Sequence, residues 1–341
     1  MLKRLFIAGL SAATLLGSGV ATAQDAPQKY EILNASYDIA RELFATINPK
    51  FQEYWKEKTG GEVVIEQSHA GTSRQAQAII QGLKADTVTF NQVTDIDALA
   101  NRGMVSEDWK SAFPNNSSPY YSTTAFLVRK GNPKNIQTWD DLVRDDVRVV
   151  FPNPKTSGNA RYSYLAAWLY AHQKFDGDEA QIRDFVAKLL HNVDTFPTGG
   201  RGATVAFAQN GQGDALLTFE SEVVNIANSD EYKDMGLEVV VPPVSVLAEF
   251  PVAVVDKVVD ERGTREIATE FLSFQYTEEI QKLLTTFNYR VHNEVAKQEA
   301  ADRFPPVELI NPESVLGSWP EIQERHFSSN GILDELLASK R

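Results

Sequence analysis

The chain alternates short apolar runs, rich in β-branched and aromatic residues, with longer segments of amphipathic, helix-like spacing. This alternation is typical of α/β layers, in which helices cover a sheet, and it argues against a β-sandwich or a helical bundle. The strand candidates are residues 31–35, 62–66, 87–90, 123–129, 147–150, 215–218, 237–241 and 251–255. A length of 341 residues is enough for about two domains of ordinary size.

Two polar stretches bounded by proline interrupt the alternation, at residues 114–121 and 241–251. Each precedes an apolar strand candidate, and we interpret both as crossings between two lobes. Two crossings make one lobe discontinuous. We therefore expect lobe 1 to comprise residues 24–118 and 244–341, and lobe 2 to comprise residues 119–243. A ligand is expected in the cleft between them.

The first 23 residues have the pattern of a secretory signal peptide. Lys3 and Arg4 precede an apolar stretch at residues 5–16, and small residues follow up to Ala23. The apolar stretch falls short of the ~20 residues that a transmembrane helix needs. We expect the peptide to be cleaved and the mature protein to be exported, most simply into a bacterial periplasm.

Charge and composition exclude several functions. Cleavage would remove two of the 33 basic residues and none of the 46 acidic ones, which leaves 31 against 46 and a net charge of −15. This is the wrong sign for nucleic-acid binding. The absence of cysteine excludes a disulfide scaffold, a thiol nucleophile and a cysteine-ligated metal. No common nucleotide-binding or catalytic motif is present, and the five histidines form no local ligand pair, so we expect no cofactor and no metal.

Three short loops rich in glycine and hydroxyl residues each precede an amphipathic helix. They are Ser-His-Ala-Gly-Thr-Ser at residues 68–73, Lys-Thr-Ser-Gly-Asn at 155–159 and Thr-Gly-Gly-Arg-Gly at 198–202, before helices expected at 74–83, 160–172 and 203–209. Glycine lets a ligand approach the backbone, and the first N–H groups of a helix point outward at the positive end of its dipole. The loops are therefore candidate anion sites.

Two readings of these loops stay open on the residues alone. The same residue types cap ordinary helices, so each loop taken singly is accounted for by capping. Three such loops facing one cleft favour a shared anion site. Arg74, Arg161 and Arg201 follow the loops closely, either to contact the anion or as surface residues paired with the many acids.

At these loops the chain resembles the periplasmic sulfate-binding proteins, which deliver sulfate or thiosulfate to an ABC importer. The matching stretches are residues 33–38, 67–71, 126–134, 152–158, 164–168 and 254–259. The resemblance implies a two-lobed α/β periplasmic binding protein of type II, closing around a dehydrated tetrahedral oxyanion that is held by helix N-termini. It also implies a membrane ABC permease as the partner, and we expect the protein itself to be a monomer.

Carried over by position, the resemblance implies main-chain N–H donors at Thr72, Gly158, Asn159 and Gly200. Ser157 would offer both its N–H and its hydroxyl. Family members usually have serine at position 72, glycine at 159 and alanine at 200, but a main-chain donor survives a side-chain change. Asp38 matches an acid that would orient the first loop without touching the ligand.

Phe219 departs from the family pattern, because it stands where the family usually has a tryptophan whose indole N–H donates to the anion. Phenylalanine has no donor. Losing one bond to a buried charged oxygen costs ~1.5 to 3 kcal/mol unless another group replaces it. We therefore hypothesise weaker sulfate binding, or a preference for thiosulfate, whose terminal sulfur is a poor acceptor.

The function expected from the sequence is capture of sulfate, or of thiosulfate, for an importer, without catalysis. A pocket of donors alone, with no carboxylate, would reject phosphate, because a P–OH group needs an acceptor. The alternatives are a binding protein for another tetrahedral oxyanion, a sensory binding protein, or an exported hydrolase of sulfate or phosphate esters. A hydrolase would need a metal or an activated nucleophile, and the sequence offers neither locally.

Overall fold

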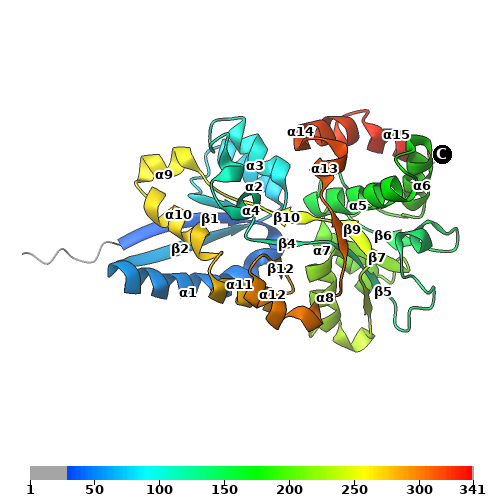
Figure 1. Ribbon diagram of the computed structural model, residues 1–341, viewed down its shortest axis with the longest axis horizontal. Helices are drawn as coiled ribbons and strands as arrows, with labels where there is room; N and C mark the ends of the chain where they lie inside the picture. The colour runs from blue at the N-terminus through cyan, green and yellow to red at the C-terminus, as the bar shows by residue number, and fades with distance from the viewer. Residues whose placement is uncertain (1–28, 340–341) are drawn as a thin grey trace, which may run out of the picture.

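The computed structural model describes residues 29–339, which form two lobes arranged along the long axis of the molecule (Figure 1). The predicted signal peptide lies outside the described residues. Within residues 29–339, no helix is long and apolar enough to cross a membrane.

Lobe 1 is built on a four-stranded sheet in the order β11-β3-β1-β2. Its strands are β1 (Lys29–Ser36), β2 (Glu62–His69), β3 (Thr87–Thr89) and β11 (Val252–Val254). β1 is parallel to both β2 and β3, whereas β11 is antiparallel to β3. The helices of this lobe are α1 (Arg41–Thr59), α2 (Thr72–Ile80), α3 (Val93–Ala100), the short turn α4 (Pro114–Ser117), α9 (Asp256–Arg262), α10 (Arg265–Phe274), α11 (Glu278–Thr286) and α12 (Glu294–Glu299).

Lobe 2 has a second four-stranded sheet in the order β6-β7-β5-β8. Its strands are β5 (Thr124–Val128), β6 (Val149–Val150), β7 (Ala215–Phe219) and β8 (Glu238–Val240). Around it lie α5 (Gly158–Lys174), α6 (Glu179–His191), α7 (Gly200–Thr204) and α8 (Glu220–Asn228). The eight strand candidates from the sequence correspond to the eight strands of the two large sheets, so the α/β prediction is confirmed.

Five further short strands were not predicted. β4 (Tyr120–Ser122), β10 (Ala248–Phe250) and β12 (Arg290–Val291) form a small sheet between the lobes, and β9 (Val244–Val246) pairs with β13 (Glu308–Ile310). Each has only two or three residues, as β3, β6, β8 and β11 also do, and each is defined by pairing with a strand distant in the chain, which no local pattern marks. β4 and β10 run antiparallel to each other where the chain passes from one lobe to the other (Figure 1).

The last three α-helices pack mainly against lobe 2. They are α13 (Pro312–Leu316), α14 (Trp319–Ile322) and α15 (Ile332–Ala338), and they lie beside α5 and α6 in Figure 1. α14 also contacts α3 of lobe 1, and Glu313 of α13 pairs with Lys110 of the same lobe. Lys155 pairs with Asp334 at 2.8 Å, and Arg183 pairs with Glu335 at 2.8 Å. This packing differs from the predicted division, which placed all of residues 244–341 in lobe 1. The apolar side of α15, including the buried Leu333, is covered by this contact.

α5 extends the helix predicted at residues 160–172 by two residues at each end. Tyr164, Leu165, Trp168 and Ala171, which recur at helical spacing, are all buried. The helix is enclosed between the β-sheet and the C-terminal helices, and the Trp168 ring lies 4.7 Å from that of His326. Because its body is fixed in this way, the first turn of α5 holds a defined position.

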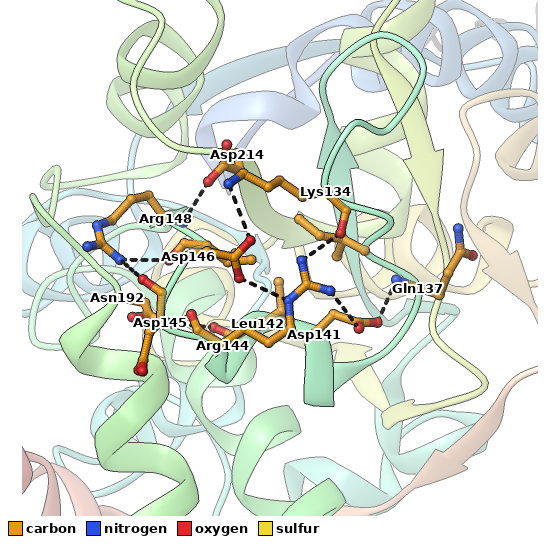
Figure 2. Close-up of polar contacts among 12 residues, drawn as sticks. Lys134, Gln137, Asp141, Leu142, Arg144, Asp145, Asp146, Arg148, Asn192 and Asp214 are labelled. Atoms are coloured by element: carbon orange, nitrogen blue, oxygen red, sulfur yellow. Dashed lines mark hydrogen bonds and ion pairs between the residues drawn. The ribbon is translucent and has the colours of Figure 1, made fainter.

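The segment joining β5 to β6 is held by polar bonds to the backbone (Figure 2). The Asn192 amide donates to the carbonyl oxygens of Leu142 and Arg144, each at 2.8 Å, and Arg144 donates to the Lys134 carbonyl at 2.7 Å. The main-chain N–H of Arg148 donates to the Asp214 carboxylate at 2.8 Å. These bonds satisfy the polar backbone of a long connection that has little regular structure.

A nearly buried ion pair ties lobe 2 to the small sheet between the lobes. Arg290 in β12 contacts the Glu220 carboxylate at the start of α8 through two bonds, of 2.6 and 2.9 Å. The side chains are 11% and 2% exposed, respectively. The two parallel bonds and the low exposure make this pair far less screened than the many surface pairs.

Replacing Arg290 should therefore destabilise the protein strongly. Arg290→Ala leaves the Glu220 carboxylate buried without its cation, and we expect the free energy of unfolding to fall by about 3–5 kcal/mol, measured by urea denaturation. Arg265→Ala is the matched control, because Arg265 pairs with Asp256 and Asp260 in exposed positions and its loss should cost less than about 1 kcal/mol. Equal losses in the two variants would contradict this account.

Candidate anion-binding site

All three glycine-containing loops meet at one cavity of about 450 Å³ between the lobes. Lobe 1 lines it with residues 37–39, 71–74 and Asn91, and lobe 2 lines it with residues 156–159, 198–202 and Glu222. Six residues singled out from the sequence are therefore brought together: Asp38, Thr72, Ser157, Gly158, Asn159 and Gly200. Their roles toward an anion stay predictions. Phe219 is not among the lining residues.

The first loop turns from β2 into α2. The N–H groups of Arg74 and Gln75 donate to the Gly71 carbonyl at 2.9 and 3.0 Å. Those of Thr72 and Ser73 lie too early in the helix to have an acceptor within it. The hydroxyl of Thr72 donates to Asp95 at 2.5 Å and that of Ser73 at 2.7 Å. With the hydroxyls directed to Asp95, the main-chain N–H groups are the donors available at the cavity.

Asp95 thus orients the first loop, a role that the sequence analysis gave to Asp38. Asp95 lies in α3 and is buried, and burial raises the pKa of its carboxyl, an effect that the hydrogen bonds from Thr72 and Ser73 oppose. Sequence reasoning missed it because an aspartate inside an amphipathic helix carries no local signal. The Asp38 residue lines the cavity itself.

The second loop begins α5 with Ser157 as its N-cap. The Ser157 hydroxyl oxygen accepts from the Ala160 N–H at 3.4 Å, and the N–H of Arg161 returns to the Ser157 carbonyl at 3.1 Å. The N–H of Ser157 donates to the Asn153 carbonyl at 3.0 Å. This differs from the expectation that Ser157 offers its N–H to the ligand. Its hydroxyl hydrogen and the N–H groups of Gly158 and Asn159 are the donors that this loop can direct at the cavity.

The third loop caps α7 at Gly199, whose carbonyl accepts the N–H of Ala203 at 3.1 Å. Gly200 is the first residue of the helix, and its N–H has no acceptor inside it. A Cβ on Gly200 would lie 3.3 Å from a Glu222 carboxylate oxygen, so the loop lies directly against that side chain.

The two lobes touch beside the cavity. A Cβ on Gly158 would lie 3.1 Å from the Gln92 Cβ and 3.2 Å from the Asn91 side-chain oxygen, both of lobe 1. Arg161 donates to the Thr94 hydroxyl at 3.2 Å across the same junction. Arg161 is therefore used in joining the lobes, whereas Arg74 and Arg201 line the cavity. The close approach at Gly158 depends on the absence of a side chain there.

Glu222 is the lining residue that sequence reasoning missed. It lies on the first turn of α8, three residues beyond Phe219, and its carboxylate accepts from the Asn159 amide at 2.9 Å and from the Thr218 hydroxyl. Burial raises the pKa of Glu222 to about 7. The expectation of a pocket with no carboxylate is therefore wrong. The helical turn after β7 brings Glu222 to the cavity, and no motif marks it.

Phe219 is fully buried behind the cavity. Its ring lies 5.1 Å from that of Phe250 and 5.9 Å from that of Tyr162, so it is part of the aromatic core where the lobes meet. It supplies no hydrogen-bond donor. Across residues 29–339 there is also no cluster of three or more side chains suited to hold a metal ion.

Two α/β lobes that meet over a cavity lined by helix N-termini define a two-lobed solute-binding protein of type II, and solved structures of similar fold agree with this class. The chain belongs to the family of bacterial extracellular solute-binding proteins, whose family model matches residues 37–290.

Several relatives have a stated ligand. The chain is 53% identical over 316 residues to a thiosulfate-binding protein of Escherichia coli K12, which covers 92% of this chain and 93% of the relative. It is 42% identical over 311 residues to a sulfate-binding protein of the same organism, covering 91% and 93%. The solved structure of the sulfate-binding protein SubI from Mycobacterium tuberculosis H37Rv matches with a TM-score of 0.76 and 32% identity, over 88% of this chain and all of that one.

The contact at Gly158 leads to a prediction for ligand affinity. Gly158→Ala places a Cβ against Asn91 and Gln92 and should oppose the contact between the lobes, at a cost of about 1–3 kcal/mol, which corresponds to an affinity loss of roughly 5- to 150-fold. Gly199→Ala is the matched control, because nothing lies within 4 Å of a Cβ there. Calorimetric titration of both variants with sulfate and thiosulfate measures the difference. Similar affinities in both would refute the steric argument.

Proposed function

We propose that this protein captures sulfate or thiosulfate in the cavity between its lobes and delivers it to a membrane ABC permease. The observation that carries the proposal is the convergence of three helix N-termini on one cavity of about 450 Å³. Its anion donors are the main-chain N–H groups of Thr72, Gly158, Asn159 and Gly200, together with the Ser157 hydroxyl. The names of the similar proteins support the choice of sulfur oxyanions.

Local donors are required here because the overall field is unfavourable. A mature chain with a net charge of −15 repels an anion at long range, so binding depends on fixed dipoles within the cavity. Hydrogen bonds to a charged oxygen contribute ~1.5 to 3 kcal/mol each, and micromolar binding requires about −8 kcal/mol in total. Five such donors contribute roughly 7.5 to 15 kcal/mol in total, so the upper part of this range meets the requirement with a remainder to offset desolvation of the ion.

Between the two anions we propose a preference for thiosulfate. Phe219 provides no donor where the resembling family uses an indole N–H, and its ring lies outside the cavity lining. A sulfate oxygen without its donor loses a charged hydrogen bond. The terminal sulfur of thiosulfate is a weaker acceptor, so placing it at this position costs less binding free energy than placing a sulfate oxygen there.

We further propose that the protein acts as a monomer in the periplasm and binds its ligand without chemical change. The apolar signal-like segment supports export. The cavity lining contains Asp38 and Glu222 besides the glycine and hydroxyl residues. Within residues 29–339 the Ser157 hydroxyl contacts the Ala160 N–H and no carboxylate or histidine that could activate it.

Titration of the purified protein with both anions tests the ligand assignment. We expect thiosulfate to bind about tenfold more tightly than sulfate, the equivalent of one weakened hydrogen bond. Isothermal calorimetry measures both affinities, with nitrate as a planar control anion that should not bind. A clear preference for sulfate would refute the thiosulfate proposal, and the absence of binding by either anion would refute the function.

A catalytic role predicts turnover of esters. We expect no release of product from aryl sulfate or aryl phosphate at high protein concentration, because the cavity lacks an activated nucleophile. Turnover that disappears in Ser157→Ala, but not in Ser273→Ala at a partly exposed position on α10, would establish a hydrolase instead.

A further inference from the structure

Glu222 is an acid in an unusual position for a protein that binds anions. It lines the cavity and is nearly buried, and its carboxylate lies 2.9 Å from the Asn159 amide nitrogen. Its other hydrogen-bond partner is the Thr218 hydroxyl. Both partners are neutral, and within residues 29–339 Glu222 forms no ion pair. Arg74 and Arg201 line the same cavity, but neither is paired with Glu222, so a negative charge at this place has no cation in contact with it.

An anion in the cavity would meet that charge at close range. Gly200, a proposed donor to the anion, has its backbone directly against the Glu222 carboxyl. Inside a dry cavity the repulsion between two like charges is screened much less than at the surface. The most economical way to remove the repulsion is a proton on the carboxyl, since no basic side chain contacts it.

The Asn159 side chain provides a second, independent observation. Its Oδ1 atom is buried and has no hydrogen-bond partner, although its Nδ2 contacts both Thr218 and Glu222. The same heavy-atom positions fit an amide turned by 180°. In that orientation a protonated Glu222 donates to Oδ1, and the amide NH₂ occupies the position that now lacks a partner. The turned amide can therefore accept the proton of a neutral Glu222, while the buried position opposite it, now occupied by the NH₂ group, still has no partner among the described residues.

We propose that Glu222 takes up a proton when the anion binds and keeps it for as long as the anion is bound. The inference rests on the proposed function, because it assumes that a doubly charged oxyanion occupies the cavity. It makes Glu222 a specificity-determining residue. Carrying a proton, Glu222 has one oxygen that donates and one that already accepts from the Thr218 hydroxyl, so it is a poor acceptor for the P–OH group of hydrogen phosphate.

The surroundings of Glu222 set the direction of the pH effect. Burial, with a smaller contribution from the charge of Asp38, raises its pKa to about 7. The titratable residues that line an adjoining cavity with Glu222 are Glu42, Arg201, Glu231, Tyr232 and Tyr289, and of these only Arg201 carries a positive charge. A bound anion adds a further upward shift. Below pH 7 the proton is already present, whereas above it binding must recruit one, so affinity falls as the pH rises.

Calorimetry of the mature chain in two buffers of different ionisation enthalpy measures the proton directly. At pH 8 we expect uptake of about 0.9 proton for each thiosulfate or sulfate bound, and an affinity ~25-fold weaker at pH 8.5 than at pH 6.5. Both anions stay fully ionised over this range. Glu222→Gln should bind without proton uptake and with an affinity independent of pH. Glu57→Gln, at an exposed position on α1 that lines neither cavity, should behave as the unmodified protein.

Three outcomes would overturn the proposal. The first is binding without proton uptake at pH 8, and the second is uptake that persists in Glu222→Gln, which would place the proton on another group such as Asp38. The third is tight binding of phosphate without uptake, which would make Glu222 an ionised acceptor. If Glu222→Gln does not fold, infrared difference spectra of the unmodified protein test the proton uptake instead. Anion binding at pH 8 should then add the band of a buried protonated carboxyl. Absence of binding by either anion at any pH would instead refute the proposed function.

Discussion

A main-chain N–H group can serve a ligand only if the first turn of its helix is held still and its other bonds are already made. The cavity depends on this condition at three places. Asp95 fixes the hydroxyls of the first loop, and the Asn153 carbonyl fixes the N–H of Ser157 in the second. The enclosed body of α5 fixes the direction of its axis. Donors prepared in this way lose little entropy on binding, because the fold has already ordered them.

The same condition explains why acids surround a proposed anion site. Asp95 accepts hydrogen bonds from the hydroxyls of the first loop, and Glu222 accepts one from the Asn159 amide of the second. These side chains are thereby bonded to the acids, and the main-chain N–H groups of the loops stay available. Burial raises the pKa of both carboxyls, which shows that each is held where a charge is poorly solvated. Asp95 has the hydroxyls of two residues and the charge of Arg161 to stabilise it, whereas Glu222 has neutral partners alone. We therefore interpret Asp95 as a carboxylate that orients the first loop, and Glu222 as the carboxylate that can bind a proton.

Much of the architecture could be predicted from the sequence, because the strands of the two large sheets are apolar runs that alternate with helices. The loops at Thr72, Ser157 and Gly200 carry a local signal as well, since glycine and hydroxyl residues stand directly before helices. The features that could not be predicted depend on contacts between residues far apart in the chain. The strands β4, β10 and β12 are defined by their partners, and α15 is placed by its packing on α6. Asp95 and Glu222 become site residues because helices far apart in the chain bring them to the loops, and neither position carries a motif.

The same few residues both form the contact between the lobes and line the cavity. Gly158 supplies a proposed anion donor and also allows Asn91 and Gln92 of lobe 1 to approach, so the geometry that presents the donor is the geometry of the closed junction. Glu222 adjoins Gly200 on the cavity side, and its neighbour Glu220 is anchored by Arg290 in the small sheet between the lobes. A shift of α8 relative to that sheet would therefore move the carboxyl and the third loop together. Because the proposed donors come from both lobes, we expect a bound ion to stabilise this arrangement, since a ligand that binds one arrangement better shifts the population toward it.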